Sequence, residues 1–500
     1  MSLKTALLAS VFTLGLIAPG RAADVTGDQA RAVAEQLRGV LVGLLTDRVK
    51  IPADLMTVVP AGEAYTIAVR SAEGLVARAD EAGKPTTAWV TATIRPDDGT
   101  RWHIDSLTFP AAVRLSQAGA TSLADLMPRN PAAVAGSAPS MEWRIRSQSA
   151  SGVFDTAQTS DSRLEFRMEG VAYDAKGFGG GADSHLTVDR MEGRYLMHPT
   201  RSGGVDYSGE ATMDGYASVT DNPSLGPIRF KTRHAAARGE TGSVMIGQVA
   251  DLIRTLVGLG LDASISQPQD DKAGRAALRT LIGTMRGVMT GAKLEESFEG
   301  VDIEAGAGRG SADRFGVAFG GEAPGDTLKA FMELSAGGLK IAGLPPDAAD
   351  FVPRSFVVRP TVANIDLKAL TELADAAAAD DADPDLMIVQ LMELFTTGGV
   401  RVGFEHLDVD LGYASMTGSG DATVVGPNAV QGSADIVVTG LDAMMAHAQK
   451  LPNAAQAMAM LALAKGFGKA QGDKTVWHIA VSPDNKILIN GMDVTGGKRK

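Results

Sequence analysis

The feature that most constrains the fold is the stretch 399–441, in which apolar and polar residues alternate. The alternating apolar residues form two sets, Val400, Val402 and Phe404, then Leu407, Val409, Leu411 and Tyr413. Strict alternation is typical of a strand that buries one face. The parity changes at Glu405-His406, which predicts a β-bulge or a bend there. Turn residues at 418–420 and 426–428 divide the rest into a meander of strands.

The meander leads into a helix whose start has a counterpart upstream. A strand, then Gly or Asn, then an aliphatic residue and an aspartate occur at 438–442 and again at 362–366. We expect Asp442 and Asp366 to be helix N-caps, because a carboxylate at that position accepts hydrogen bonds from the first free backbone N–H groups. Replacing either by Ala is then expected to cost about 0.5–2 kcal/mol.

These two helix starts predict a repeated unit of strand, helix and hairpin. The helical regions 367–396 and 442–468 are each divided by a polar or Pro-containing break and followed by a hairpin. Three copies are predicted, at 228–320, 355–425 and 430–493. The blocks of strands and helices do not alternate strictly, which favours α+β over a doubly wound parallel sheet. The predicted fold is a long curved antiparallel sheet with helices packed on one face.

The N-terminus, residues 1–22, has the pattern of a secretory signal. Lys4 precedes a short apolar segment, Leu7 to Ala18, and small residues at Gly20 and Ala22 fit a cleavage site before Ala23. The apolar segment is shorter than the ~20 residues that a membrane-spanning helix needs. We therefore expect a mature chain that begins at Ala23, lies in the periplasm, is soluble and has no transmembrane span.

The mature chain is expected to form two domains. Residues 23–127 form an α+β domain that opens with a helix over 26–49, where Thr26 and Gln29 make a capping box. Residues 128–140 contain Pro, Gly, Ala and Ser without periodicity and are predicted to be a linker. Residues 141–500 form an elongated β-rich domain with helical insertions. Tryptophan-containing hairpins are predicted at 89–104 and 477–489.

Composition excludes several functional classes. The formal net charge is −12, whereas a nucleic-acid partner or an anionic lipid surface requires a basic face. The chain has no cysteine, which rules out disulfides, zinc–thiolate sites and cysteine nucleophiles.

No catalytic or cofactor motif is recognisable. The seven histidines are dispersed, and we interpret them as surface residues. Residues 381–392 begin like a calcium loop, but Leu386 and Met392 stand where the loop needs Gly and Glu, so the aspartates are interpreted as a helix start. The glycine-rich segments 177–181 and 468–475 lack the strand-to-helix context of a phosphate-binding loop. The sequence thus predicts no catalytic residues, no cofactor and no metal.

The helical region after Gly440 is rich in methionine. Met444, Met445, Met458 and Met460 are interpreted first as core packing beneath the sheet. The alternative is an adaptable lining for an apolar ligand, because methionine side chains are flexible and polarisable.

The C-terminal part of the chain, about residues 340–493, resembles a known family. The similar segments are Gly343-Leu344-Pro345, 351–356, 364–367, Gly418-Ser419-Gly420, 438–442 and 487–491. They resemble the YdgA-like exported proteins of unknown function from Gram-negative bacteria, with a looser similarity to AsmA-like proteins. The resemblance implies an envelope role, with lipid or outer-membrane material as partners, and supplies no catalytic residues. The long N-terminal region departs from it.

Three hypotheses follow for function. The first is a non-enzymatic periplasmic protein that binds an apolar, lipid-like ligand or an envelope partner. The second is an envelope assembly or structural factor that acts through exposed sheet edges. The third is an envelope hydrolase, which would need carboxylates brought together from distant segments.

Overall fold

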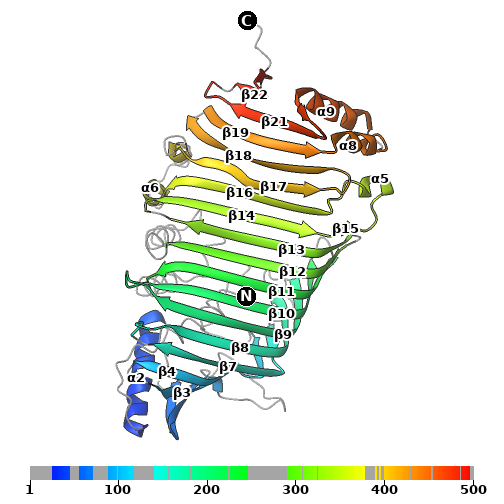
Figure 1. Cartoon of the computed structure of the whole chain (residues 1–500). Coiled ribbons are helices and arrows are strands. Elements are labelled where there is room, and N and C mark those ends of the chain that lie inside the picture. The colour runs from blue at the N-terminus through cyan, green and yellow to red at the C-terminus, as the bar shows by residue number, and fades with distance from the viewer. Residues whose placement is uncertain are drawn as a thin grey trace. The chain divides into compact units, whose positions relative to one another are not determined.

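A computed structural model describes most of the chain (Figure 1). The described residues are 25–45, 56–70, 88–97, 100–116, 140–155, 157–178, 182–222, 226–245, 290–306, 308–323, 325–377, 389–390, 393–395, 399–426, 429–451, 454–484 and 486–495. The chain divides into two compact units. Unit 1 comprises Met1–Arg229 and His234–Thr290, and unit 2 comprises Phe230–Arg233 and Gly291–Lys500. The predicted signal segment, most of the calcium-like loop and residues 246–289 of the first predicted repeat lie outside the described residues.

Unit 1 is an antiparallel sheet with one helix at its N-terminal end. Its elements are α2 (Gly27–Leu45), β1 (Met56–Ala61), β2 (Ala64–Arg70), β3 (Ala88–Pro96), β4 (Arg101–Thr108), β5 (Ala112–Ser116), β6 (Ser140–Arg144), β7 (Ser147–Asp155), β8 (Ser162–Phe178), β9 (Ala182–Pro199) and β10 (Val205–Asn222). Strand β11 (Gly226–Val244) has residues in both units. Neighbouring strands pair in the order β1, β2, β3, β4, β7, β8, β9, β10, and β6 joins β5 to β8.

Two of these pairings connect strands on either side of the predicted linker. Strand β4 pairs with β7, and β5 pairs with β6. Of the predicted linker, only Ser140 is described, and it begins β6. The pairing of β3 with β4 confirms the predicted hairpin at 89–104.

Helix α2 closes the N-terminal end of unit 1. It begins as predicted, because the Thr26 backbone N–H donates to the Gln29 side chain at 3.1 Å and the Gln29 N–H donates to the Thr26 hydroxyl at 3.3 Å. Ala30 then packs among side chains of β2, β3, β4 and β7. The buried members of this cluster are Ala30, Tyr65, Ile67, Ala92, Ile94, Trp102 and Phe154. We call this group the α2 cluster.

Unit 2 continues with antiparallel strands and short helices. Its elements are β12 (Gly291–Ala305), β13 (Gly308–Glu322), β14 (Thr327–Gly337), β15 (Lys340–Ile341), α5 (Pro346–Ala349), β16 (Ser355–Asp366), α6 (Leu367–Ala377), β17 (Arg401–Asp410), β18 (Ser415–Gly426), β19 (Ala429–Thr439), α8 (Leu441–Ala448), α9 (Ala454–Phe467), β20 (Lys469–Gln471), β21 (Lys474–Val481), β22 (Ile487–Ile489) and β23 (Met492–Asp493). Strands pair in the order β12, β13, β14, β16, β17, β18, β19, β21, β22, β23, with β15 on β13 and β20 on β21.

The parity change at Glu405-His406 is a bulge, as predicted. Arg359 of β16 pairs with His406, whereas the next residue, Pro360, pairs with Phe404, so Glu405 is the extra residue. The same irregularity separates Phe404 from Leu407 in the pairing of β17 with β18. The final hairpin is also confirmed, because β21 pairs with β22.

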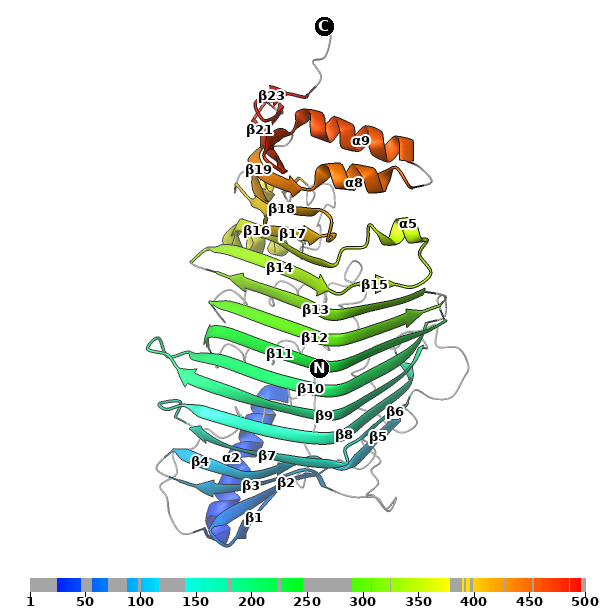
Figure 2. The ribbon, with the colours of Figure 1, turned by 45° about the vertical axis from the view of Figure 1, so that its right-hand side comes forward.

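The long strands bend, and the bends have a common construction (Figure 2). Gly215 of β10 has φ of 65°, and a side chain there would collide with the Asp189 carboxylate of β9. Gly338, after β14, has φ of 66° and would collide in the same way with Asp313 of β13. Both positions need a residue that adopts left-handed backbone and has no Cβ. Gly170 of β8, with φ of 59°, has a similar arrangement, because a Cβ there would lie 2.9 Å from the Arg146 Cβ.

The two predicted N-caps differ. Asp366 precedes α6, and its carboxylate accepts hydrogen bonds from the N–H groups of Lys368 at 2.8 Å and Ala369 at 3.1 Å, as predicted. The prediction for Asp442 is wrong, because α8 begins at Leu441, two residues earlier than a cap at Asp442 requires, with Gly440 as its N-cap. The Met444 N–H donates to the Gly440 carbonyl at 3.0 Å, so the helical hydrogen bonds begin before the aspartate.

The fold class is confirmed in its coarser part only. The described chain is mostly antiparallel sheet with few helices, but helices packed along one face of it are not confirmed. Among the described residues, α2 packs at the start of unit 1 and α8 with α9 at the end of unit 2. Helices α6 and α8 follow strands β16 and β19 directly, so each starts at a strand end.

Candidate functional site

One face of the unit 2 sheet is lined by apolar residues that lie in register across the strands. Residues directly opposite each other on paired strands point to the same face. One such row runs through β13, β14, β16, β17, β18, β19 and β21 as Val317, Leu334, Val358, Leu407, Gly418, Ile436 and Trp477. A parallel row runs as Phe315, Ala336, Phe356, Val409, Met416 and Val438. We call the side that carries these rows the apolar face.

Part of the apolar face is open. Phe319 of β13 lies opposite Met332 of β14, and each is two residues from the first row, so both belong to the apolar face. Their side chains are 45% and 44% exposed. Val402 of β17, on the same face, is 39% exposed. Phe319 and Met332 are thus adjacent, half-exposed apolar side chains on the apolar face.

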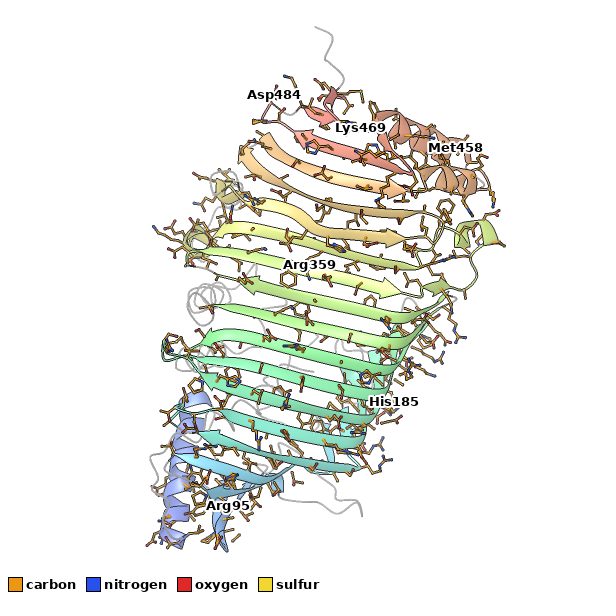
Figure 3. The ribbon with its side chains drawn as sticks, in the orientation of Figure 1. Arg95, His185, Arg359, Met458, Lys469 and Asp484 are labelled. Atoms are coloured by element: carbon orange, nitrogen blue, oxygen red, sulfur yellow. The ribbon has the colours of Figure 1, made fainter. Side chains whose placement is uncertain are left out.

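The opposite face of the same strands is charged. Arg359 donates to Glu333 at 2.7 Å and lies 3.8 Å from the Glu405 carboxylate, which also pairs with Lys329 at 2.8 Å. The Arg359 guanidinium also lies 5.1 Å from the centre of the Phe331 ring. Figure 3 labels Arg359 among these strands. Because the charges are paired with each other on this face, the apolar face is left for an apolar contact.

Unit 1 has the same two-faced pattern. Two of its apolar rows are Leu164, Tyr195 and Gly209, and Met168, Met191 and Met213. On the other face Glu165, Arg194 and Glu210 lie in register, with Arg194 and Glu210 2.8 Å apart. This methionine row is not among the features predicted from the sequence. The signal that could have found it is the placement of Met191 between Arg190 and Glu192, which predicts a residue facing away from both.

Helices α8 and α9 close the C-terminal end of the apolar face. Val438, Leu441 and Trp477 are buried together, and partly buried side chains from both helices pack around them. The Trp477 indole N–H donates to the Ala464 carbonyl of α9 at 2.8 Å. The open strands therefore adjoin a stretch of the same face that is covered.

The predicted methionine lining divides among different surroundings. Met444 packs against the buried cluster at Trp477, which agrees with a core role. Met445 on α8 and Met458 on α9 are half-buried, whereas Met460 is 67% exposed. Figure 3 labels Met458 on α9. A ligand lining made by these four residues remains a prediction.

A second group of polar residues lies where α5, α8 and the β17–β18 turn meet. The His447 Nδ1 atom is 2.7 Å from the Asp350 carboxylate, and the His447 ring stacks on Tyr413 with centroids 3.9 Å apart. The Tyr413 hydroxyl is buried and has no hydrogen-bond partner among the described residues. Burial, and then the negative charge of Asp350, raise the pKa of Tyr413. The contacts hold α8 against α5.

Histidine–aspartate pairs recur across the described chain. The pairs are His103 with Asp97, His185 with Asp174, His198 with Asp161, His234 with Asp214, His447 with Asp350, and His478 with Asp435. In the sequence the histidines are simply dispersed, because their aspartate partners come from other strands or turns. Within the described residues no group of three or more His, Cys, Asp or Glu is placed to hold a metal.

One buried carboxylate has a structural role. Asp155, at the end of β7, accepts hydrogen bonds from the hydroxyls of Thr100, Thr159 and Ser160 and from the backbone of the turn that follows. Burial alone raises the pKa of Asp155, but these hydrogen bonds outweigh burial and hold it well below its ordinary value. Asp155 is thus an ionised residue that fixes a turn.

Comparison of the chain with protein-family models, with curated proteins and with solved structures found no match. Within the part of the chain that the structure describes, no helix is long and apolar enough to cross a membrane.

Proposed function

We propose that the protein binds an extended apolar chain, such as the acyl chain of a lipid, on the apolar face of unit 2 and carries out no covalent chemistry there. The observation that supports this is the adjacent, half-exposed pair Phe319 and Met332 on a face that is otherwise apolar. Exposed apolar patches of this kind are rare in proteins that bind nothing.

The dimensions of the open surface suit an acyl chain. The rows of the apolar face cross β13, β14, β16, β17 and β18. Five strands spaced ~4.8 Å apart span about 19 Å. One leaflet of hydrocarbon is about 15 Å thick, half of the ~30 Å bilayer core. Gly418 and Ala422 of β18 lie on this face and leave room for a chain to lie close to the backbone. A single acyl chain laid across the strands would cover the exposed side chains.

The proposed setting is the periplasm, reached through residues 1–22 as a cleaved signal. N-terminal sequencing of the chain from a periplasmic fraction is expected to begin at Ala23. A chain that still began at Met1 in a membrane fraction would overturn this setting.

Binding is tested with a fluorescent fatty acid and two substitutions on the apolar face. Phe319→Asp and Met332→Asp each put a charge where the acyl chain would lie, and we expect each to lower the affinity at least tenfold. Both side chains are nearly half-exposed, so the fold survives the change.

Two controls make the result specific. Thr417→Asp puts the same charge on the exposed, opposite face of β18 and is expected to leave affinity unchanged. Met332→Leu keeps the surface apolar and is also expected to bind. If the unaltered protein takes up no lipid probe, the proposal fails, and assembly through sheet edges takes its place.

The methionine lining is tested in the same assay. If α8 and α9 contribute to the binding surface, Met445→Asp or Met458→Asp abolishes uptake of the probe by folded protein. If the binding surface is confined to the open strands, both variants bind the probe as the unaltered chain does.

A further inference from the structure

The solvent-facing side of α9 is apolar. Of its eight exposed residues, only Gln456 and Lys465 are polar. The others are Ala455, Ala459, Met460, Ala462, Leu463 and Gly466. Met460 and Leu463 are 67% and 63% exposed, more than any other large apolar side chain among the described residues.

The other side of α9 is already used. Leu461, Ala464 and Phe467 pack against the buried cluster that contains Trp477. A surface helix with a core-facing apolar side normally presents polar residues on the opposite side. Helix α9 is instead apolar on both sides, and its outer side has no partner among the described residues.

The size of the outer side argues against a stable dimer as its use. At ~1.5 Å per residue the 14 residues of α9 are about 21 Å long, and with a width near 10 Å they offer on the order of 200 Å². A stable protein interface needs about 800 Å² from each partner. A bilayer has no such threshold, because each apolar side chain that enters the interfacial region is buried independently.

The charge around α9 differs from that of the whole chain. Residues 441–474 contain four lysines, Lys450, Lys465, Lys469 and Lys474, and two acids, Asp442 and Asp473. The local balance is therefore 4 − 2 = +2, in a chain whose net charge is −12. All four lysines are exposed. Lys465 pairs with Asp442, so the positive charge that an approaching surface meets comes mainly from Lys450, Lys469 and Lys474, because charges beyond the Debye length of about 8 Å are largely screened at physiological salt.

We propose that the outer side of α9, with Met460 and Leu463 inserted and the four lysines at the headgroups, docks the protein onto an anionic lipid bilayer. An apolar helix side flanked by lysines is the arrangement that binds in the plane of a membrane interface. This surface lies on a different element from Phe319 and Met332, so it stands independently of the proposed acyl-chain site.

Vesicle flotation of the mature chain tests the proposal. We expect flotation with vesicles of phosphatidylcholine mixed with phosphatidylglycerol, and weaker flotation with phosphatidylcholine alone. Met460→Asp and Leu463→Asp are expected to lower the bound fraction at least tenfold. Lys469→Glu combined with Lys474→Glu is expected to lower binding to the anionic vesicles only. Because all these side chains are exposed, circular dichroism and the melting temperature serve to show that each variant is folded.

Controls separate this proposal from the preceding one. Phe319→Asp is expected to lose the fatty-acid probe and keep flotation, whereas Leu463→Asp is expected to keep the probe and lose flotation. The proposal is overturned if the unaltered chain does not float, if Met460→Asp floats equally well, or if neutral and anionic vesicles bind equally. It is also overturned if sedimentation shows a dimer that Leu463→Asp dissociates and no vesicle binds, because a second copy would then be the occupant.

Discussion

The α2 cluster of unit 1 and the open strands of unit 2 are built from the same alternation of apolar and polar residues, yet they end in different states. In the α2 cluster a helix lies on the strands, and Trp102 is 6% exposed. On β13 and β14 the side chains of Phe319 and Met332 are left nearly half-exposed. Alternation therefore decides which residues share a face, and the element that packs on that face decides whether it becomes a core or a surface.

The largest expected effect separates these two regions directly. Trp102→Ala removes a buried ring that stacks on Phe154 and is expected to lower the free energy of unfolding by about 3–5 kcal/mol. Phe319→Ala, at a site that is 45% exposed, is expected to cost about 1 kcal/mol or less. Urea denaturation of both variants measures the difference. Equal losses would mean that Phe319 is as well packed as the α2 cluster.

A smaller effect concerns the turn beside the α2 cluster. Asp155→Asn removes the charged acceptor of three hydroxyls and is expected to cost about 1–3 kcal/mol at pH 7. Because the pKa of Asp155 is lower in the folded than in the unfolded chain, its contribution is present above pH ~3.8 and is lost as the pH falls below it. The difference in unfolding free energy between the unaltered chain and Asp155→Asn should therefore shrink progressively as the pH falls below about 4. A constant difference over that range would show that the charge does not matter.

The two helix starts sharpen the comparison within unit 2. Asp366→Ala removes the acceptor of two backbone N–H groups and is expected to cost about 0.5–2 kcal/mol. Asp442→Ala removes only an exposed ion pair with Lys465 and is expected to cost less than about 0.5 kcal/mol. Thermal unfolding of both variants measures the two losses of stability. Similar losses at both positions would restore the equivalence that the sequence pattern suggests.

The smallest effect is expected where the covered end of the apolar face meets α5. Tyr413→Phe removes a buried hydroxyl without a described hydrogen-bond partner and keeps the ring that stacks on His447. We expect a change within about ±0.5 kcal/mol, or a slight gain, because no hydrogen bond is lost. Tyr413→Ala is the contrasting variant, since it removes the stacked ring. A large loss in Tyr413→Phe would reveal a partner for the hydroxyl.

Local patterns predicted local structure well. The bulge at Glu405, the capping box at Thr26 and the hairpins at both ends depend on neighbouring residues, and all are confirmed. The predicted cap at Asp442 failed because α8 begins at Leu441, with Gly440 as its N-cap. In the same motif upstream, Asn364 is also at positive φ, yet α6 begins only at Leu367, two positions later in the motif. A pattern of residue types does not distinguish these two outcomes.

The sequence predicted that the candidate site is an apolar face of the sheet, but not which residues are exposed on it. Alternation near 400–413 indicated an apolar face, but the adjacency of Phe319 to Met332 depends on the register between β13 and β14. The prediction concentrated on methionines of α8 and α9, because their density stands out in the sequence. The methionine row of unit 1 is spread over three strands and has no local signature.

The bends have a consequence for how the strands find their partners. Slipping one strand past its neighbour by one residue exchanges the faces, whereas a slip by two residues keeps every apolar residue on the apolar face. Alternation alone therefore leaves even slips nearly equivalent in energy. At the bend, a slip by two would bring Met213 or Ala217 in place of Gly215 against the Asp189 carboxylate, where a Cβ does not fit. The glycines at the bends therefore select one pairing register from several that would otherwise be similar in energy.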